Sequence, residues 1–161
     1  MAPTMSILMR LHHFVNRLAR PKTLGVQGVV IDPENRVFLV RHTYHGGWHF
    51  PGGGVEAGET LRQALTREVR EEAAIEVVGR PRLLDVFYND LYSRRDHIAV
   101  FIVDDFRVIG QRAPDWEIAE AGFFGIEDLP PDTTPETRRR LEEILEDREP
   151  AEHWRARDKG G

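Results

Sequence analysis

The sequence of 161 residues contains no cysteine, which excludes a disulfide framework and a thiolate metal site. It also lacks an apolar run of the roughly 20 residues that cross a bilayer, so we expect no transmembrane segment. A net charge of −5 gives no reason to expect general affinity for nucleic acid. With 40% hydrophobic and 30% charged residues, the chain is typical of one globular domain, and we expect it to be cytoplasmic.

Acidic residues are also missing from the chain before Asp32. Residues 1–22 instead combine Arg and Lys with apolar residues at helical spacing, which predicts a basic amphipathic helix. We expect this helix to lie on the surface or to pack in a homodimer; a targeting peptide or a membrane-surface helix are the alternatives. The rest divides into a central domain, residues 23–149, and a C-terminal tail, residues 150–161, which we expect to be frayed.

Turn signals and hydrophobic runs divide the central domain into strands and helices. The strand-like segments are residues 23–31, 36–42, 83–88, 98–104 and 121–126. The first two flank a turn at residues 32–35 and are expected to pair as a hairpin, and the third and fourth should form a second pair. Residues 59–73 and 134–149 predict helices. Helices before, between and after strands indicate an α/β sandwich of three layers.

The first of these helices gathers acidic residues on one side. At about 100° per residue, Glu68, Glu71 and Glu72 share one arc, next to an apolar ridge. Like charges at this spacing weaken an isolated helix by a few tenths of a kcal/mol per pair. A bound divalent cation would turn this repulsion into a favourable interaction. Because the donors are oxygens, without cysteine or a close pair of histidines, the arc favours Mg²⁺ or Mn²⁺ over Zn²⁺.

The stretch from residue 52 to residue 75 resembles the Nudix box of MutT-like hydrolases, G-x5-E-x7-R-E-U-x-E-E-x-G-U, in which U is aliphatic. The matching residues are Gly53, Glu59, Arg67, Glu68, Val69, Glu71, Glu72 and Ile75. Ala74 stands where the family has a glycine that ends the helix in a left-handed turn, and alanine there costs about 1–2 kcal/mol if φ is positive. A solvated Arg- and Glu-rich helix face accounts for residues 67–72 alone, but not for the glycines and the glutamate at fixed offsets before them.

The resemblance implies a Nudix α/β/α sandwich with a mixed β-sheet over about residues 23–149. It also implies Mg²⁺-dependent hydrolysis of the pyrophosphate bond in a nucleoside diphosphate linked to another moiety. Nucleotide sugars, ADP-ribose, dinucleoside polyphosphates and nucleoside triphosphates are the substrates of this kind. A catalytically silent nucleotide-sensing domain and an RNA-end pyrophosphohydrolase are the alternatives. The three intact box glutamates favour catalysis, and the shortage of basic residues near the site disfavours RNA.

Roles for individual box residues also follow from the resemblance. It implies that the carbonyl of Gly52 and the carboxylates of Glu68, Glu71 and Glu72 bind the metal ion. Arg67 and Glu59 are expected to orient these carboxylates. Which glutamate accepts the proton of the attacking water stays open at this point.

Residues outside the box complete the set of candidates. Family members often use a further acid from a later loop as ligand or base, and here the best match is Glu117, with Glu120 in reserve. For substrate binding, Trp48 and Tyr92 are aromatic residues near expected loop mouths, where a base could stack. Tyr92 is also near the tyrosine offset of dinucleoside polyphosphate hydrolases. Arg94 is a candidate for a phosphate contact.

Overall fold

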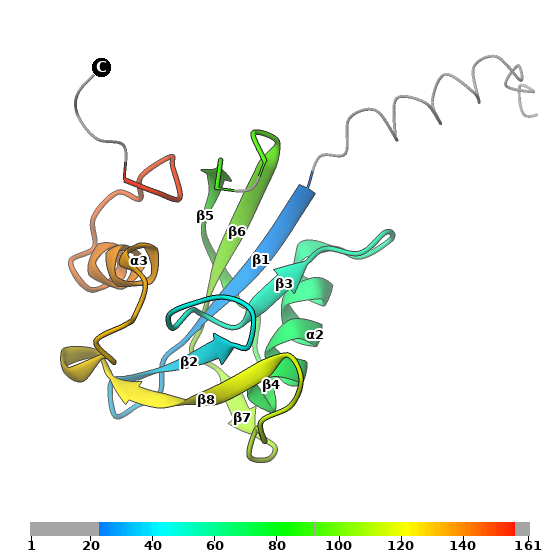
Figure 1. Ribbon diagram of the computed structural model, residues 1–161, viewed down its shortest axis with the longest axis vertical. Helices are drawn as coiled ribbons and strands as arrows, with labels where there is room; N and C mark the ends of the chain where they lie inside the picture. Colours follow the sequence, from blue (N-terminus) through cyan, green and yellow to red (C-terminus); the bar gives the residue numbers. More distant parts are fainter. Residues whose placement is uncertain (1–22, 92, 157–161) are drawn as a thin grey trace, which may run out of the picture.

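A computed structural model describes residues 23–91 and 93–156 (Figure 1). The amphipathic helix expected at residues 1–22 and the candidate Tyr92 lie outside this range. The strands are β1 (Thr23–Val30), β2 (Arg36–His42), β3 (Gly52–Gly54), β4 (Ile75–Val77), β5 (Arg82–Asn89), β6 (Asp96–Val103), β7 (Phe106–Val108) and β8 (Ile118–Gly125). The helices are α2 (Leu61–Ala73), the 3₁₀ turn η1 (Ile126–Asp128) and α3 (Pro135–Leu145).

The main sheet has four strands in the order β3-β1-β6-β5. β1 runs parallel to β6, whereas β3 and β5 run antiparallel to their neighbours, so the sheet is mixed. Two further antiparallel pairs, β2 with β8 and β4 with β7, extend the structure. The pairing of β5 with β6 was expected, whereas β3, β4 and β7 are short strands that the sequence pattern did not separate from loops.

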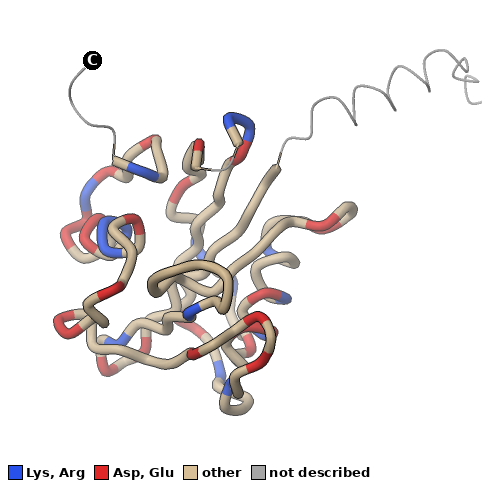
Figure 2. The backbone as a smooth tube through the Cα atoms, viewed as in Figure 1, with Lys and Arg blue, Asp and Glu red and all other residues tan. Residues whose placement is uncertain are grey.

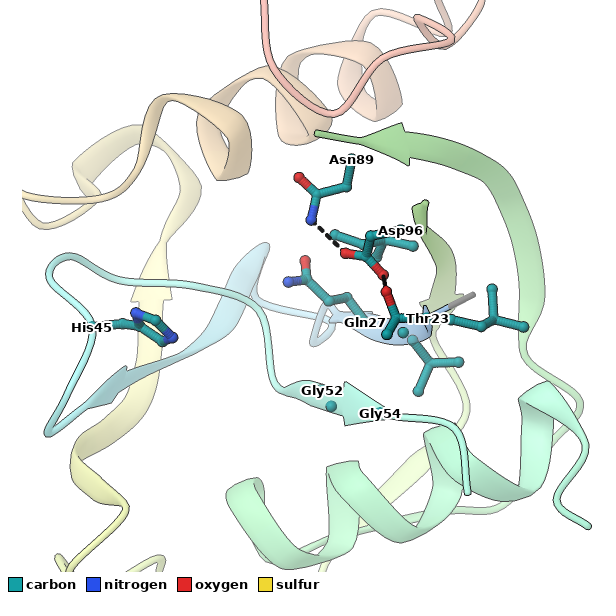
Figure 3. A pocket seen from close by; sticks show the side chains of 12 residues that line it. Thr23, Gln27, His45, Gly52, Gly54, Asn89 and Asp96 are labelled. Carbon is teal, nitrogen blue, oxygen red and sulfur yellow. Dashed lines mark hydrogen bonds between the residues drawn. The ribbon is translucent and has the colours of Figure 1, made fainter. Parts of the chain in front are cut away.

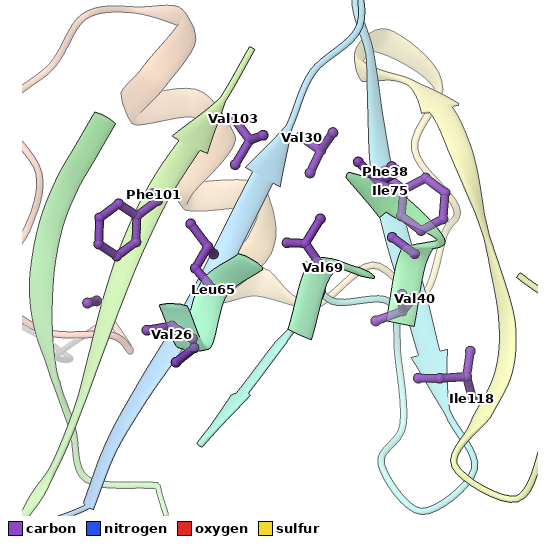
Figure 4. Close-up of a cluster of buried hydrophobic side chains, with 13 residues drawn as sticks. Val26, Val30, Phe38, Val40, Leu65, Val69, Ile75, Phe101, Val103 and Ile118 are labelled. Carbon is purple, nitrogen blue, oxygen red and sulfur yellow. The ribbon is translucent and has the colours of Figure 1, made fainter. Parts of the chain in front are cut away.

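Side chains alternate between the two faces of β1, and each face packs against a different helix. Val26 and Val30 lie in one buried cluster with Leu65 and Val69 of α2 (Figure 4). Val29 belongs to a second cluster, which also contains Leu141 of α3 and Trp154. The sheet therefore separates α2 from α3, and the predicted three-layer α/β/α sandwich is confirmed.

A glycine in β1 lets α2 approach the sheet closely. A Cβ on Gly28 would lie 2.9 Å from Cγ2 of Val69 and 3.2 Å from Cδ1 of Leu65. Because no side chain stands between them, α2 lies directly against the strand that borders β3. The acidic side of the same helix contacts β3.

The expected hairpin of β1 and β2 is wrong. The turn between them exists, with Asn35 at φ 59°, but a single bridge, Ile31 to Val37, links the two segments. β1 pairs with β6 along its length and with β3 over residues 25–27, whereas β2 pairs with β8 along its whole length.

Both ends of α2 lie close to those of the helix predicted at residues 59–73. Thr60 caps the N-terminus in a capping box with Gln63. Ala74 ends the helix at φ 53°, in the left-handed region, although it is alanine. This helix presents its acidic side toward β3 and its apolar side toward β1.

The described part of the C-terminal tail, residues 150–156, is packed rather than frayed. The N–H of Tyr88 donates to the carbonyl of Glu152, and the N–H of Trp154 donates to the carbonyl of Tyr88, both at 2.9 Å. Trp154 is buried against Phe87, and the guanidinium of Arg140 lies 4.2 Å from the centre of the Phe87 ring. The expectation failed because a tail rich in charged residues still contains one large apolar anchor.

Charged residues are interspersed along the backbone, and basic and acidic stretches lie next to one another on α3 and at the β5–β6 turn (Figure 2). Over residues 23–91 and 93–156, no helix has both the length and the apolar character needed to span a membrane.

Candidate active site

The acidic side of α2 is joined to the glycine strand by direct contacts. The N–H of Gly52 donates to Oε2 of Glu72 at 2.9 Å. A Cβ on Gly53 would lie 2.4 Å from Oε1 of Glu68, so this position has room only for glycine while Glu68 keeps its place. Glycines in β3 thus allow two carboxylates of the helix to reach the edge of the main sheet.

Arg67 ties the loop before α2 to the same carboxylates. Its Nε and Nη2 donate to the two oxygens of Glu59 at 2.8 and 2.9 Å. Its Nη1 donates to Oε1 of Glu68 at 2.6 Å, and Nη2 also donates to the carbonyl of Gly54 at 3.0 Å. One guanidinium therefore holds Glu59, Glu68 and the end of β3 in a fixed relation, the arrangement expected for a residue that orients ligands.

Three side chains from different elements converge next to this contact. His42 ends β2, Glu72 comes from α2 and Glu117 precedes β8, and one potential ligand atom of each lies within 4.8 Å of the others. Nε2 of His42 is 3.7 Å from Oε1 of Glu72. The hydroxyl of Tyr44 donates to Oε1 of Glu117 at 3.5 Å. Residues far apart in the sequence are thus brought to one point.

Burial and mutual repulsion perturb the ionisation of this group. Burial raises the pKa of Glu72 to about 8, and the nearby Glu68 and Glu117 add to the rise. The pKa of Glu68 is also raised, chiefly by burial. Burial lowers the pKa of His42 to about 4, so its imidazole is neutral near pH 7. In contrast, the hydrogen bonds from Arg67 lower the pKa of Glu59 to about 2.

A divalent cation fits this donor set. Glu72 is only 4% exposed and close to two other carboxylates, and a nearby positive charge would remove the penalty that burial places on its ionised form. Nδ1 of His42 is buried without a hydrogen-bond partner among the described residues. Glu71 differs, since its side chain is 61% exposed and lies 3.7 Å from Arg67, outside the three-residue cluster.

A hollow of about 370 Å³, lined by both apolar and polar residues, lies on the other side of β3. It joins a smaller one of about 200 Å³, and the two share Gln27, His45, Gly52, Asn89 and Ile98. Asp96 accepts hydrogen bonds from Oγ1 of Thr23 and Nδ2 of Asn89, both at 2.7 Å. In Figure 3, β3 lies between these side chains and α2, so Gly52 borders both the carboxylates and the hollow.

Two of the residues expected to bind substrate, Trp48 and Arg94, do not line the hollow. Trp48 is buried in the core, where it packs against Phe124 at a ring distance of 4.7 Å and lines none of the described hollows. We assign it to packing. Arg94 lies exposed in the turn between β5 and β6 and does not line the hollow. Glu120 is paired with Arg41 instead of joining the cluster.

Several residues of the site were missed by sequence reasoning. His42 gave no signal because it looks like an ordinary strand end, and Gln27 is one polar residue in an apolar strand. Asn89 and Asp96 are neighbours only because β5 and β6 pair, with Asn89 opposite Asp96. An isolated polar residue on the α3 face of β1 is the one cue that the sequence offered for the hollow.

Comparison with known proteins decides the family. A family model described as NUDIX domain matches residues 21–144. The chain belongs to the Nudix family. Over 120 residues this Nudix chain is 33% identical to an ADP-ribose pyrophosphatase of Methanocaldococcus jannaschii, covering 71% of the chain and 68% of that protein. It is also 38% identical over 84 residues to an 8-oxo-dGTP diphosphatase of Proteus vulgaris, covering 50% of the chain and 74% of that protein.

Solved structures agree with this placement. A MutT Nudix hydrolase from Burkholderia pseudomallei superposes with a TM-score of 0.65 at 26% identity, covering 76% of the chain and 97% of that structure. Curated Nudix relatives are named as diphosphatases and pyrophosphatases. The chain is accordingly an enzyme, a Nudix pyrophosphohydrolase, and the family generally uses a divalent metal ion.

Proposed function

We propose that this Nudix hydrolase cleaves the pyrophosphate bond of a small nucleotide in which a nucleoside diphosphate is linked to another moiety, with Mg²⁺ as an activating ion. One observation carries the proposal: the buried carboxylate of Glu72 meets Glu117 and the N–H of Gly52, and Gly52 borders the hollow. The names of the relatives, which include ADP-ribose and 8-oxo-dGTP hydrolases, support a nucleotide substrate.

Several carboxylates would bind the ion together. Glu72, Glu117 and the Gly52 carbonyl are the proposed ligands nearest the hollow, and Glu68 lies beside them. Glu71 is exposed and is proposed as a ligand facing solvent. Mg²⁺, when bound, neutralises charge on the pyrophosphate oxygens and acidifies a water molecule.

Separate roles are proposed for proton transfer, for orienting the carboxylates and for binding the nucleoside. Glu117 is half-buried, and Tyr44 hydrogen-bonds one of its oxygens, so we propose Glu117 as the acceptor of the proton of the attacking water. Arg67 and Glu59 fix Glu68 and the end of β3 by the contacts described above. Gln27 and Asn89 offer amide groups to the nucleoside part in the hollow.

A substrate screen tests the proposal. The purified protein is incubated with nucleoside triphosphates including 8-oxo-dGTP, ADP-ribose, nucleotide sugars and dinucleoside polyphosphates, with Mg²⁺ or with EDTA, and products are separated by anion-exchange chromatography. We expect one class to be hydrolysed only with Mg²⁺. Glu72→Gln should lower kcat by at least about 100-fold. Glu142→Gln, an exposed acid on α3, is the matched control.

The proposal fails if Glu72→Gln keeps normal turnover. It also fails if every nucleotide is bound but none is hydrolysed with any divalent ion, which would favour a nucleotide-sensing domain.

A further inference from the structure

His42 occupies an unusual position for a strand-end histidine. Its side chain is 10% exposed, and it lines the smaller hollow between β3 and α3. Its Nδ1 is buried and has no hydrogen-bond partner among the described residues. Its Nε2 lies 3.7 Å from Oε1 of Glu72, which is longer than a hydrogen bond. Nε2 is thus the ring nitrogen that faces the carboxylates, and it makes no hydrogen bond to Glu72.

The separation from Glu72 suits a shared cation. Two atoms that each lie about 2.1 Å from one ion are at most about 4.2 Å apart. The 3.7 Å between His42 and Glu72 is within that limit, and all three ligand atoms of the cluster lie within 4.8 Å of one another. Only a small movement of the third side chain, Glu117, would bring all three to one ion.

We propose that His42 supplies a nitrogen ligand to the divalent cation held by Glu72 and Glu117, and that the site consequently binds Mn²⁺ more tightly than Mg²⁺. The inference rests on the proposed function, since it adds a ligand to the same metal site. Mg²⁺ is a hard cation that prefers oxygen donors, whereas imidazole nitrogen is a good donor to first-row transition metals. A mixed set of one nitrogen and several oxygens therefore shifts the selectivity away from Mg²⁺.

Pulsed electron paramagnetic resonance tests the ligand directly. Mn²⁺ is added to the full chain below one equivalent, and electron spin echo envelope modulation is recorded without substrate. We expect ¹⁴N modulation from a coordinated imidazole, replaced by a ¹⁵N pattern when the protein carries ¹⁵N-labelled histidine. Labelling needs no mutation, so this result does not depend on whether a variant folds.

Variants then assign the signal to one residue. His42→Gln keeps a polar side chain but replaces the imidazole by an amide. This variant should abolish the ¹⁴N modulation. In isothermal titration, Mn²⁺ affinity should fall by at least about 10-fold while Mg²⁺ affinity changes by less than about 3-fold. His97→Gln, which removes an exposed histidine of β6, is the matched control and should keep the modulation and both affinities.

Each alternative result overturns the inference. If wild-type protein binds Mn²⁺ without nitrogen modulation, or if the modulation survives in His42→Gln, then His42 is not a ligand. The hydrolase proposal stands in that case as long as Glu72→Gln still abolishes metal-dependent turnover. If Glu72→Gln leaves both Mn²⁺ binding and turnover intact, the metal site itself lies elsewhere, and both proposals fail.

Discussion

Arg67 donates to both carboxylate oxygens of Glu59, from Nε at 2.8 Å and from Nη2 at 2.9 Å. The two residues are eight positions apart, across the start of α2, so the pair fixes the loop after β3 relative to the helix. The same guanidinium contacts Glu68 and the carbonyl of Gly54. A planar fork of donors makes these contacts together, and a lysine cannot reproduce them.

Replacing Arg67 by lysine tests this orienting role. Lysine keeps the charge but has one nitrogen, so Glu68 and the end of β3 lose their common partner. We expect kcat to fall by about 10- to 100-fold and Mg²⁺ affinity to weaken, with the melting temperature nearly unchanged. Arg70→Lys, on the exposed side of α2, should behave as wild type. Equal kinetics for the two variants would mean that Arg67 forms only a surface ion pair.

Ala74 offers a test of backbone strain at the end of α2. It has φ 53° without being glycine, and the family pattern has glycine here. Ala74→Gly should stabilise the protein by about 1 kcal/mol, because relief of the left-handed conformation exceeds the entropy that glycine loses on folding. Chemical denaturation measures the change. Ala73→Gly, inside the helix and buried, should destabilise instead; an unchanged or lowered stability for Ala74→Gly would contradict the assigned strain.

The metal-free protein should lose stability as the pH rises between 6.5 and 8. The pKa of Glu72 is about 8 in the folded protein against an ordinary 4.5, so the folded state binds a proton that the unfolded state has released. That contribution is present below pH 4.5 and is lost as the pH passes 8. His42 acts in the opposite direction, but only below its ordinary pKa of 6.5.

Urea denaturation in EDTA at pH 6.5 and pH 8.5 measures this effect. Glu72→Gln should flatten the difference in the free energy of unfolding between the two pH values, because glutamine does not titrate. Saturating Mg²⁺ should stabilise the wild type more at pH 8.5 than at pH 6.5, since the ion competes with the proton for Glu72. A pH dependence that is the same in wild type and Glu72→Gln would assign the titration to another group.

Trp154 anchors the C-terminal segment to β5. The ring is 6% exposed and packs on Phe87, and its backbone bonds to Tyr88. Trp154→Ala should destabilise the protein by about 3–5 kcal/mol, in proportion to the cavity it leaves. Trp116→Ala is the control, because Trp116 is 81% exposed and its removal should change stability by less than about 0.5 kcal/mol. Similar melting temperatures for the two variants would refute the anchoring role.

Local features of this fold could be predicted from the sequence because neighbouring residues determine them. Helices were predicted over residues 59–73 and 134–149, and α2 and α3 form there, started by Thr60 with Gln63 and by Thr134 before Pro135. The left-handed end at Ala74 follows from the motif position alone. Such features depend on a few adjacent side chains and backbone angles.

Non-local features could not be predicted in this way. β1 and β2 are joined by a good turn signal, yet β1 pairs with β6 and β3, and β2 pairs with β8. Periodicity shows which residues are apolar but not which strand is the partner. For the same reason His42 and the hollow were missed, because their chemistry exists only after three separate segments meet.

The pairing of β2 with β8 has a consequence for synthesis of the chain on the ribosome. Phe38 lies opposite Phe123, so β2 emerges about 80 residues before the strand that completes its ladder. During that interval the edge of β2 that pairs with β8 is open, and an open strand edge favours aggregation until it is paired. The last strand to be translated is also the one that brings Glu117 to Glu72, so the cluster of His42, Glu72 and Glu117 forms only late in synthesis.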